Sequence, residues 1–139
     1  MTGRRQAREL ALQGLYAYEI HQRDVDEIFE QVTRESNLGD KPLQYARRLM
    51  ETVIKNLEFV DKEIGRLAQN WELERIALID RIILRMALTE IHFMPDIPEK
   101  VAINEAIDLA KEYSTIESSS FVNGILDAAL VKSRRPADA

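Results

Sequence analysis

Apolar side chains recur every three or four residues along most of the chain, which is the spacing that places them on one face of an α-helix. The first such segment covers residues 4–21, and its apolar face consists of Ala7, Leu10, Ala11, Gly14, Leu15 and Tyr18. A shorter segment follows at residues 25–35. The run SNLGD at residues 36–40 breaks the pattern, so we expect Gly39 to stop one helix and Asp40 to be the N-cap of the next.

The middle of the chain keeps the helical pattern for longer than most globular helices do. It extends over residues 40–70, so we expect a bend or break near residues 58–61. Residues 75–92 are densely apolar and regularly charged, which favours a central helix over a strand. Pro95 and Pro98 then separate this helix from another at residues 98–113, because proline is tolerated in the first turn of a helix but not in its interior.

The last helix is predicted at about residues 117–131, with Thr115 as its candidate N-cap. Gly124 lies inside this helix, where glycine costs about 0.5–1 kcal/mol relative to alanine. We therefore expect another helix to pack closely against it. Residues 134–139 predict a frayed tail. Since no strand pattern and no internal repeat occurs, the fold class is all-α with about seven helices.

Composition limits the class of protein. The 139 residues are 45% hydrophobic and 31% charged, which is typical of one folded domain. Cysteine is missing, which excludes disulfides, thiolate metal sites and a cysteine nucleophile, and fits a reducing compartment. No stretch approaches the ~20 apolar residues of a membrane-spanning helix, and the N-terminus has no apolar signal core. We expect a cytoplasmic protein that contacts no membrane.

Motifs for catalysis and metal binding are scarce. The sequence has no phosphate-binding glycine loop, no nucleophile elbow and no HExxH pair. His21 and His92 each follow a glutamate by two positions, and side chains at i and i+2 point apart on a helix. We interpret both as surface histidines near helix ends. The sequence therefore predicts no catalytic residue, no metal and no cofactor, and a protein that is not an enzyme.

Positive charge at the start of the first helix stands out in a chain of formal net charge −5. Arg4, Arg5 and Arg8 all precede the first acid, Glu9. A helix start carries the positive end of the peptide dipole, where each arginine costs about 0.3–1 kcal/mol. An acidic whole does not attract nucleic acid at long range, so any such binding must use local charge.

Two interpretations of this helix remain open. The side opposite its main apolar face also carries Leu12, Tyr16 and Ile20. Either these three bury against a second layer, or they form with the arginines an exposed strip for single-stranded nucleic acid, by phosphate contact and base stacking. Three phosphate contacts imply a salt slope of only about −2. Useful RNA affinity would then need a second surface or a partner protein.

A second cluster, TIESSSFVNGILD, covers residues 115–127. Ser118, Ser119 and Ser120 at a helix start supply hydroxyl and backbone N–H donors, which predicts an anion site. Capping alone would explain one or two of these serines. Asn123 is either a local polar contact or a residue that recognises a base, and the pattern does not decide between them.

Three stretches in order, from about residue 4 to residue 131, resemble the NusB family of bacterial transcription antitermination factors: RRQARELALQGLY, LIDRIILRMALTEI and IPEKVAINEAIDLAKEYSTIESSSFVNGILD. The last is the most specific. The resemblance implies an all-α domain of two three-helix subdomains, roughly residues 1–59 and 60–133, around a long first helix. It also implies binding to the boxA element of nascent ribosomal RNA together with NusE, a small-subunit ribosomal protein, on RNA polymerase. No enzyme activity is implied.

The resemblance also assigns residues. Those that fall on positions near RNA are Arg4, Arg5 and Arg8 for phosphates, and Tyr113, Glu117, Phe121 and Asn123 before and within FVNG. Those that fall where the family meets NusE are Tyr16 and Asp80. Two positions depart from the pattern. Gln6 stands where some members carry a third consecutive arginine, and Glu117 stands where a shorter aspartate is expected.

Other classes of protein were weighed against this interpretation. A similar helical domain forms the N-terminus of ribosomal RNA cytosine-5 methyltransferases, which need a cysteine nucleophile and a separate cofactor-binding domain. A chain of 139 residues without cysteine provides neither. A helical protein–protein adaptor that binds no RNA is the alternative that remains. The choice between monomer and homodimer stays open, because some family members dimerise.

Overall fold

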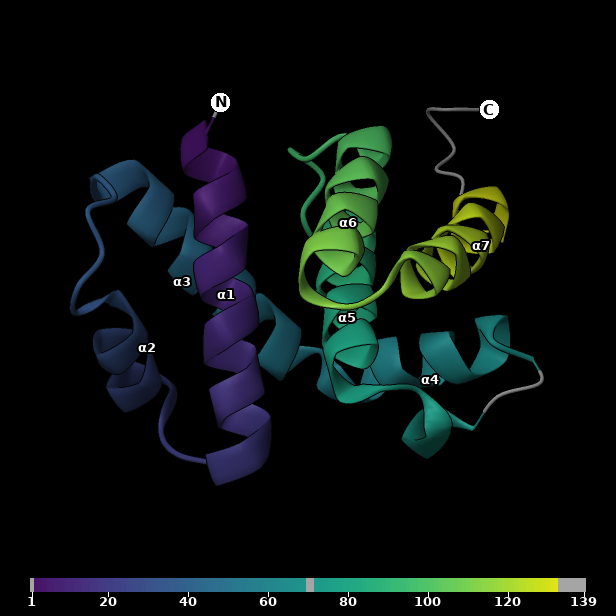
Figure 1. The fold of residues 1–139 in the computed structure, drawn as a ribbon, viewed down its shortest axis with the longest axis horizontal. Coiled ribbons are helices and arrows are strands. Elements are labelled where there is room, and N and C mark those ends of the chain that lie inside the picture. The colour runs from purple at the N-terminus through teal and green to yellow at the C-terminus, as the bar shows by residue number, and fades with distance from the viewer. Residues whose placement is uncertain (1, 70–71, 133–139) are drawn as a thin grey trace. The chain divides into compact units, whose positions relative to one another are not determined.

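The computed structural model describes residues 2–69 and 72–132, and these residues are almost entirely helical (Figure 1). The elements are α1 (Thr2–His21), α2 (Val25–Thr33), α3 (Asp40–Lys55), α4 (Leu57–Leu67), a short 3₁₀ helix η1 (Leu73–Arg75), α5 (Leu78–Phe93), α6 (Glu99–Tyr113) and α7 (Ile116–Lys132). Seven α-helices and no strand in the described part of the chain confirm the all-α prediction. The predicted tail at residues 134–139 lies outside the described residues.

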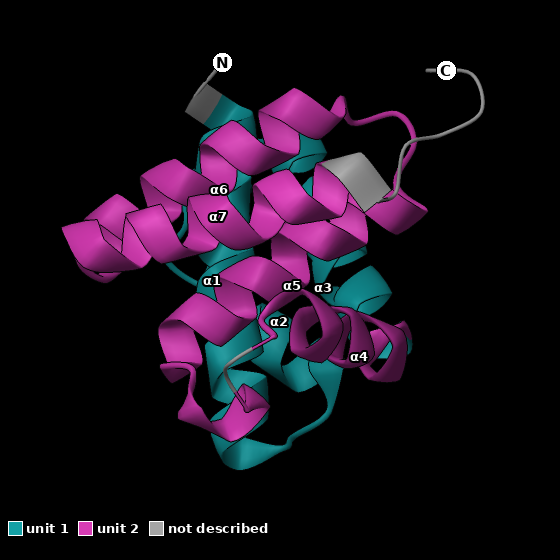
Figure 2. Cartoon of the chain, turned by 90° about the vertical axis from the view of Figure 1, so that its right-hand side faces the viewer, with its two compact units in different colours: residues 1–55 teal, residues 56–139 magenta. Residues whose placement is uncertain are grey.

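Contacts between helices divide the chain into two compact units, Met1–Lys55 and Asn56–Ala139 (Figure 2). The first unit holds α1, α2 and α3, and the second holds α4 to α7. The border lies close to the one expected near residue 59. Each unit is described below by itself.

In the first unit, α1 packs against both α2 and α3. Its core contains the fully buried Ile28 from α2 and Leu49 and Met50 from α3. Gly14 allows the closest approach, since a Cβ built on it would lie 2.5 Å from Cε of Met50. The apolar stripe that the sequence predicted for α1 is thus the face that forms this core.

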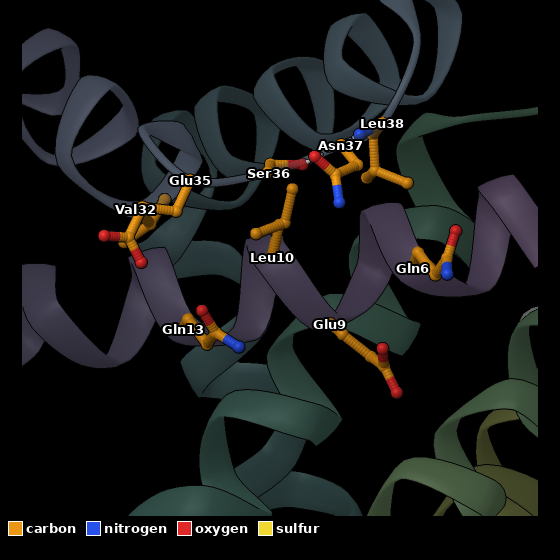
Figure 3. Close-up of a pocket in the computed structure, with 9 residues that line it drawn as sticks. All are labelled: Gln6, Glu9, Leu10, Gln13, Val32, Glu35, Ser36, Asn37 and Leu38. Carbon is orange, nitrogen blue, oxygen red and sulfur yellow. Dashed lines mark hydrogen bonds between the residues drawn. The ribbon is translucent and has the colours of Figure 1, made fainter.

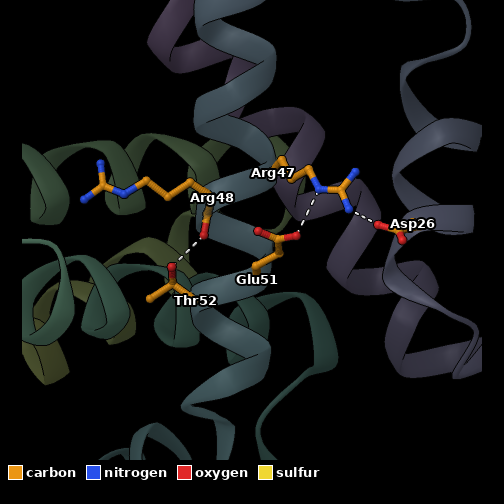
Figure 4. A network of polar contacts seen from close by, with 5 residues as sticks. All are labelled: Asp26, Arg47, Arg48, Glu51 and Thr52. Carbon is orange, nitrogen blue, oxygen red and sulfur yellow. Dashed lines mark hydrogen bonds and ion pairs between the residues drawn. The ribbon is translucent and has the colours of Figure 1, made fainter.

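Polar contacts between α2 and α3 surround Arg47 (Figure 4). Its guanidinium pairs with Asp26 of α2 and, through Nε, with Oε2 of Glu51 at 2.9 Å. The same group lies 5.4 Å from the ring centroid of Phe29. Exposed ion pairs contribute only about 0–1 kcal/mol. Burial of Ile28, 1% exposed, therefore contributes more to holding α2 in place.

The long helical pattern at residues 40–70 is interrupted at Asn56, slightly before the expected range of 58–61. The backbone of Asn56 leaves the helical region, with φ −110° and ψ 21°, and its carbonyl accepts the N–H of Val60 at 3.0 Å as α4 starts. The start of α5 was predicted three residues too early. Ile76 and Ala77 have extended backbones, and the turn η1 was not predicted.

In the second unit, α5 is the central helix, because it packs against α4, α6 and α7 (Figure 1). Every residue from 82 to 91 is buried. This includes Arg85, which donates to both carboxylate oxygens of Asp61 on α4, at 2.7 and 3.0 Å. Removing one partner of such a pair typically costs about 3–5 kcal/mol. The prediction of a central helix is confirmed, and charges inside it are paired to a neighbouring helix.

Three predicted helix-end and packing features have different outcomes. Thr115 is the N-cap of α7, since its Oγ1 accepts the backbone N–H of Ser118 at 2.9 Å. Asp40 is instead the first residue of α3, and α2 ends at Thr33, well before Gly39. The close packing expected at Gly124 is wrong, because a Cβ there would meet nothing within 4 Å.

The helices of the described residues were also examined for membrane spans. None of them combines the length and the apolar character that crossing a bilayer requires.

Candidate nucleic-acid and partner interface

The arginines at the start of α1 do not share one environment. Arg4 and Arg5 are exposed, whereas only 3% of Arg8 is exposed. Arg8 was expected on a solvated strip, so the structure changes the part it can play. Two guanidinium groups at the start of α1 reach solvent, and the third lies beneath the surface.

Tyr45 of α3 explains this arrangement. Cζ of Arg4 lies 4.0 Å from the centroid of the Tyr45 ring and Cζ of Arg8 lies 5.4 Å from it. Nη2 of Arg8 also donates a long hydrogen bond, 3.5 Å, to the Tyr45 hydroxyl. A cation over an aromatic face gains about 0.5–2 kcal/mol. Contact with Tyr45 therefore offsets much of the cost of placing Arg4 and Arg8 at a helix start.

Sequence reasoning assigned Tyr45 to the core and missed its contact with the arginines. Tyr45 is indeed buried, with 5% of its surface exposed. It lies 37 residues from Arg8 in the chain, so no local spacing links the two. Only the packing of α1 on α3 brings them together.

The remaining residues of the predicted strip divide between the two interpretations. Leu12 is buried, 2% exposed, while Tyr16 and Ile20 are exposed at 42% and 52%. Tyr16 follows Arg5 by eleven positions, which is about 16 Å along a helix axis. Tyr16 and Ile20 thus form an apolar surface separate from the arginines, which fits a protein contact better than a base stacked beside an Arg-bound phosphate.

In the second unit, candidate residues meet at the end of α6 and the start of α7. Glu117 and Phe121 line a pocket of about 260 Å³ whose other lining residues are Arg75, Ile76, Ala77, Asp80 and Ser118. Tyr113 is 39% exposed and does not line the pocket, and Asn123 is exposed further along α7. The structure therefore joins Asp80, Glu117 and Phe121 in one site.

Asp80 is not an open surface carboxylate. It is 5% exposed, and its Oδ2 accepts a hydrogen bond from Oγ of Ser118 at 2.8 Å. Its other oxygen, Oδ1, is buried and has no hydrogen-bond partner within the described part of the chain. A partner protein would have to reach into the pocket to contact this side chain.

The hydroxyl groups at the start of α7 converge on Ser118. Its Oγ accepts from Oγ of Ser114 at 2.9 Å and from Oγ1 of Thr115 at 3.0 Å, and then donates to Asp80. Ser119 donates to the carbonyl of Ile116 at 2.7 Å. The donors that predicted an anion site therefore hold the protein's own carboxylate, Asp80.

Ile116 was missed by sequence reasoning. It is the first residue of α7 and is 75% exposed, the largest exposure among the large hydrophobic residues described. The signal was present, because Ile116 lies outside the apolar stripe of α7 and directly follows the cap residue Thr115. Together with Tyr113 it forms an apolar corner at the α6–α7 turn.

The two histidines occupy helix ends, as expected. His21 is exposed, but His92 is partly buried, with its Nε2 3.5 Å from Oε2 of Glu63 and its ring 5.3 Å from that of Phe59. The ranges 2–69 and 72–132 contain no group of three or more His, Cys, Asp or Glu side chains placed to hold a metal ion.

Known proteins with similar sequences and folds point in one direction. The model of the NusB family matches residues 5–130. The transcription antitermination protein NusB of Chloroherpeton thalassium is 46% identical over 129 residues, which are 92% of this chain and 61% of that protein's length. This chain thus spans less than two thirds of that relative.

Two solved structures extend the similarity to the fold. NusB of T. maritima is 34% identical, with a TM-score of 0.88 over 97% of this chain and 95% of that one. A crystal structure of the antitermination factors NusB and NusE in complex with dsRNA contains a chain that is 26% identical, with a TM-score of 0.87 over 95% of this chain and 98% of that one. Because the family model and these relatives cover nearly all of the chain, this protein belongs to the NusB family.

Proposed function

We propose that this chain is a transcription antitermination factor that binds single-stranded, boxA-type RNA of nascent ribosomal transcripts, together with NusE, on RNA polymerase. The names of its relatives support the class. The observation that carries the RNA contact is the stacking of Arg4 and Arg8 on Tyr45, which fixes positive charge at the start of α1 in a chain of net charge −5.

Arg4 and Arg5 are the proposed phosphate ligands. A guanidinium whose face lies on a ring keeps its N–H donors at its edge, in its own plane, where they can meet phosphate oxygens. The ring contact at 4.0 Å also restricts Arg4 before RNA arrives, which lowers the entropy cost of binding. Arg8 adds positive charge beneath this surface and holds Tyr45, and we assign it to positioning more than to direct contact.

The second surface is proposed to contact bases. Tyr113 and Phe121 offer rings, and a stacked base contributes about 1–3 kcal/mol. Glu117 and Asn123 are exposed and offer a carboxylate and a carboxamide to base edges. Such a surface would supply the affinity that two phosphate contacts cannot.

NusE is proposed to contact Tyr16 directly, since its ring is 42% exposed. Asp80 is proposed to act by a different route. It is buried and bonded to Ser118, so it fixes the start of α7 and the pocket beside Glu117. NusE would then recognise Tyr16 and the shape of this pocket.

A binding experiment with a matched control tests the RNA contact. Fluorescence anisotropy of a labelled boxA-like single-stranded RNA is measured for the wild type and for Arg4→Ala/Arg5→Ala, with and without NusE, over a range of salt. Losing two phosphate contacts should reduce the salt slope by about 1.4, at ~0.7 per contact. At roughly 1 kcal/mol each, the affinity should fall about thirtyfold.

Arg23→Ala/Arg34→Ala is the control, because it removes the same charge from exposed arginines of the same unit. It should keep the wild-type slope and affinity. Equal affinity for all three proteins, with NusE binding intact, would support the protein–protein adaptor instead.

A further inference from the structure

A groove in the first unit is not used by the proposed function. It lies between α1 and the segment that follows α2, and has a volume of about 510 Å³ (Figure 3). The lining residues, here called the α1–α2 groove, are Gln6, Glu9, Leu10, Gln13, Val32, Glu35, Ser36, Asn37 and Leu38. None of them is a residue that we propose for RNA or NusE binding.

The polar part of the lining is acidic and amide-rich. It holds the carboxylates of Glu9 and Glu35 and the carboxamides of Gln6, Gln13 and Asn37, and no lysine, arginine or histidine. Carboxylates without a neighbouring cation repel phosphate, so this groove does not suit RNA. Carboxamides both donate and accept hydrogen bonds, which matches the N–H and C=O groups of a peptide backbone.

The apolar part of the lining forms a strip on both walls. Leu10 points from α1 toward the 36–38 segment, and the carboxamide of Asn37 points back toward α1 (Figure 3). Val32 and Leu38 are half-buried on the opposite wall. The N–H of Leu38 donates to Oγ of Ser36 at 3.1 Å, which fixes the turn of this wall. The groove is therefore formed before any partner binds.

Gln6 also bears on the charge of this groove. It stands where some proteins of the family carry a third consecutive arginine. An arginine here would place a cation on the lining, beside Glu9. The neutral Gln6 leaves the lining of this chain with negative charge alone.

We propose that the α1–α2 groove binds an extended peptide segment of a protein partner that carries a lysine or arginine next to an apolar side chain. The carboxylate of Glu35 pairs with the cation, the carboxamides bond to the peptide backbone, and the apolar side chain rests on Leu10. Charge complementarity selects this occupant. A second copy of this chain, or RNA, would be a different occupant that the test below detects.

NMR spectroscopy tests the proposal on the full chain. The probe is an acetylated, amidated octapeptide of alternating leucine and lysine, and its control is the same peptide with glutamate in place of lysine. The lysine peptide should shift the side-chain NH₂ signals of Gln6, Gln13 and Asn37, and the glutamate peptide should not. Glu35→Lys should weaken the lysine peptide about fivefold or more, as expected for losing an ion pair and adding a like charge.

Glu30→Lys is the matched variant, since Glu30 is exposed on α2 and does not line the groove. It should bind the lysine peptide as the wild type does. The proposal is overturned if both peptides bind alike, or if the two variants weaken binding equally. It is also overturned if RNA shifts these NH₂ signals, or if raising the concentration of the chain alone does. Because Glu35→Lys should leave boxA-like RNA affinity unchanged, failure here is distinguishable from failure of the proposed function.

Discussion

At the scale of single residues, Tyr45 has the largest consequence for the RNA proposal, because two arginines contact its ring. Tyr45→Phe keeps the ring and loses only the 3.5 Å contact to the hydroxyl, so RNA affinity should stay within about twofold. Tyr45→Leu loses the ring, and cation–π contacts of about 0.5–2 kcal/mol with it. RNA affinity should then fall severalfold in anisotropy titrations, with circular dichroism still helical. Equal affinity for the two variants would contradict a role for the ring.

Gly124 leads to a prediction about stability. A Cβ there would meet no atom within 4 Å, and the residue is exposed inside α7. Gly124→Ala should therefore raise the free energy of unfolding by about 0.5–1 kcal/mol, by helix propensity alone. Urea unfolding followed by circular dichroism measures this. Gly14→Ala is the contrast, since its Cβ would lie 2.5 Å from Met50, and it should not stabilise. A lower stability of Gly124→Ala would mean that something unseen approaches this position.

At the scale of elements, the start of α7 depends on the contact between Ser118 and Asp80. Ser118→Ala removes the donor to Oδ2 of Asp80 and leaves a carboxylate that is 5% exposed without this hydrogen bond. The free energy of unfolding should fall by about 1–3 kcal/mol, the usual cost of an unsatisfied buried polar group. Ser120→Ala changes an exposed serine of the same helix and should stay within about 0.5 kcal/mol. Urea midpoints of the two variants compare them, and equal midpoints would show that the contact contributes nothing.

Elements were predictable from the sequence where their periodicity is strong, and their ends were predictable where a side chain makes a local bond. Thr115 is such a case, because a cap acts on the backbone N–H three residues later. The break at Asn56 was misplaced by a few residues, since apolar spacing continues across it. The exposures of Arg8, Leu12 and Asp80 were not predictable, because they depend on side chains of other helices such as Tyr45 and Ser118.

At the scale of the whole molecule, weak RNA affinity and a protein partner belong to one argument. A chain of net charge −5 with two exposed arginines at the start of α1 gains little from long-range attraction, so NusE must add affinity if the complex is to form at useful concentrations. If NusE tightens RNA binding by some factor, RNA must tighten NusE binding by the same factor, because the two equilibria are linked. Anisotropy for RNA and calorimetry for NusE, each with and without the third component, measure both factors.

The same cycle separates the proposed roles of the two surfaces. Arg4→Ala/Arg5→Ala should lower RNA affinity and leave the coupling factor unchanged, since these arginines are proposed to contact RNA alone. Tyr16→Ala should weaken NusE binding, and in the absence of NusE its RNA affinity should match that of the wild type, because Tyr16 lies about 16 Å along α1 from Arg5. A coupling factor of one in the wild type would mean that RNA and NusE bind independently. In that case the acidic chain would need an RNA surface of its own that is larger than the one described.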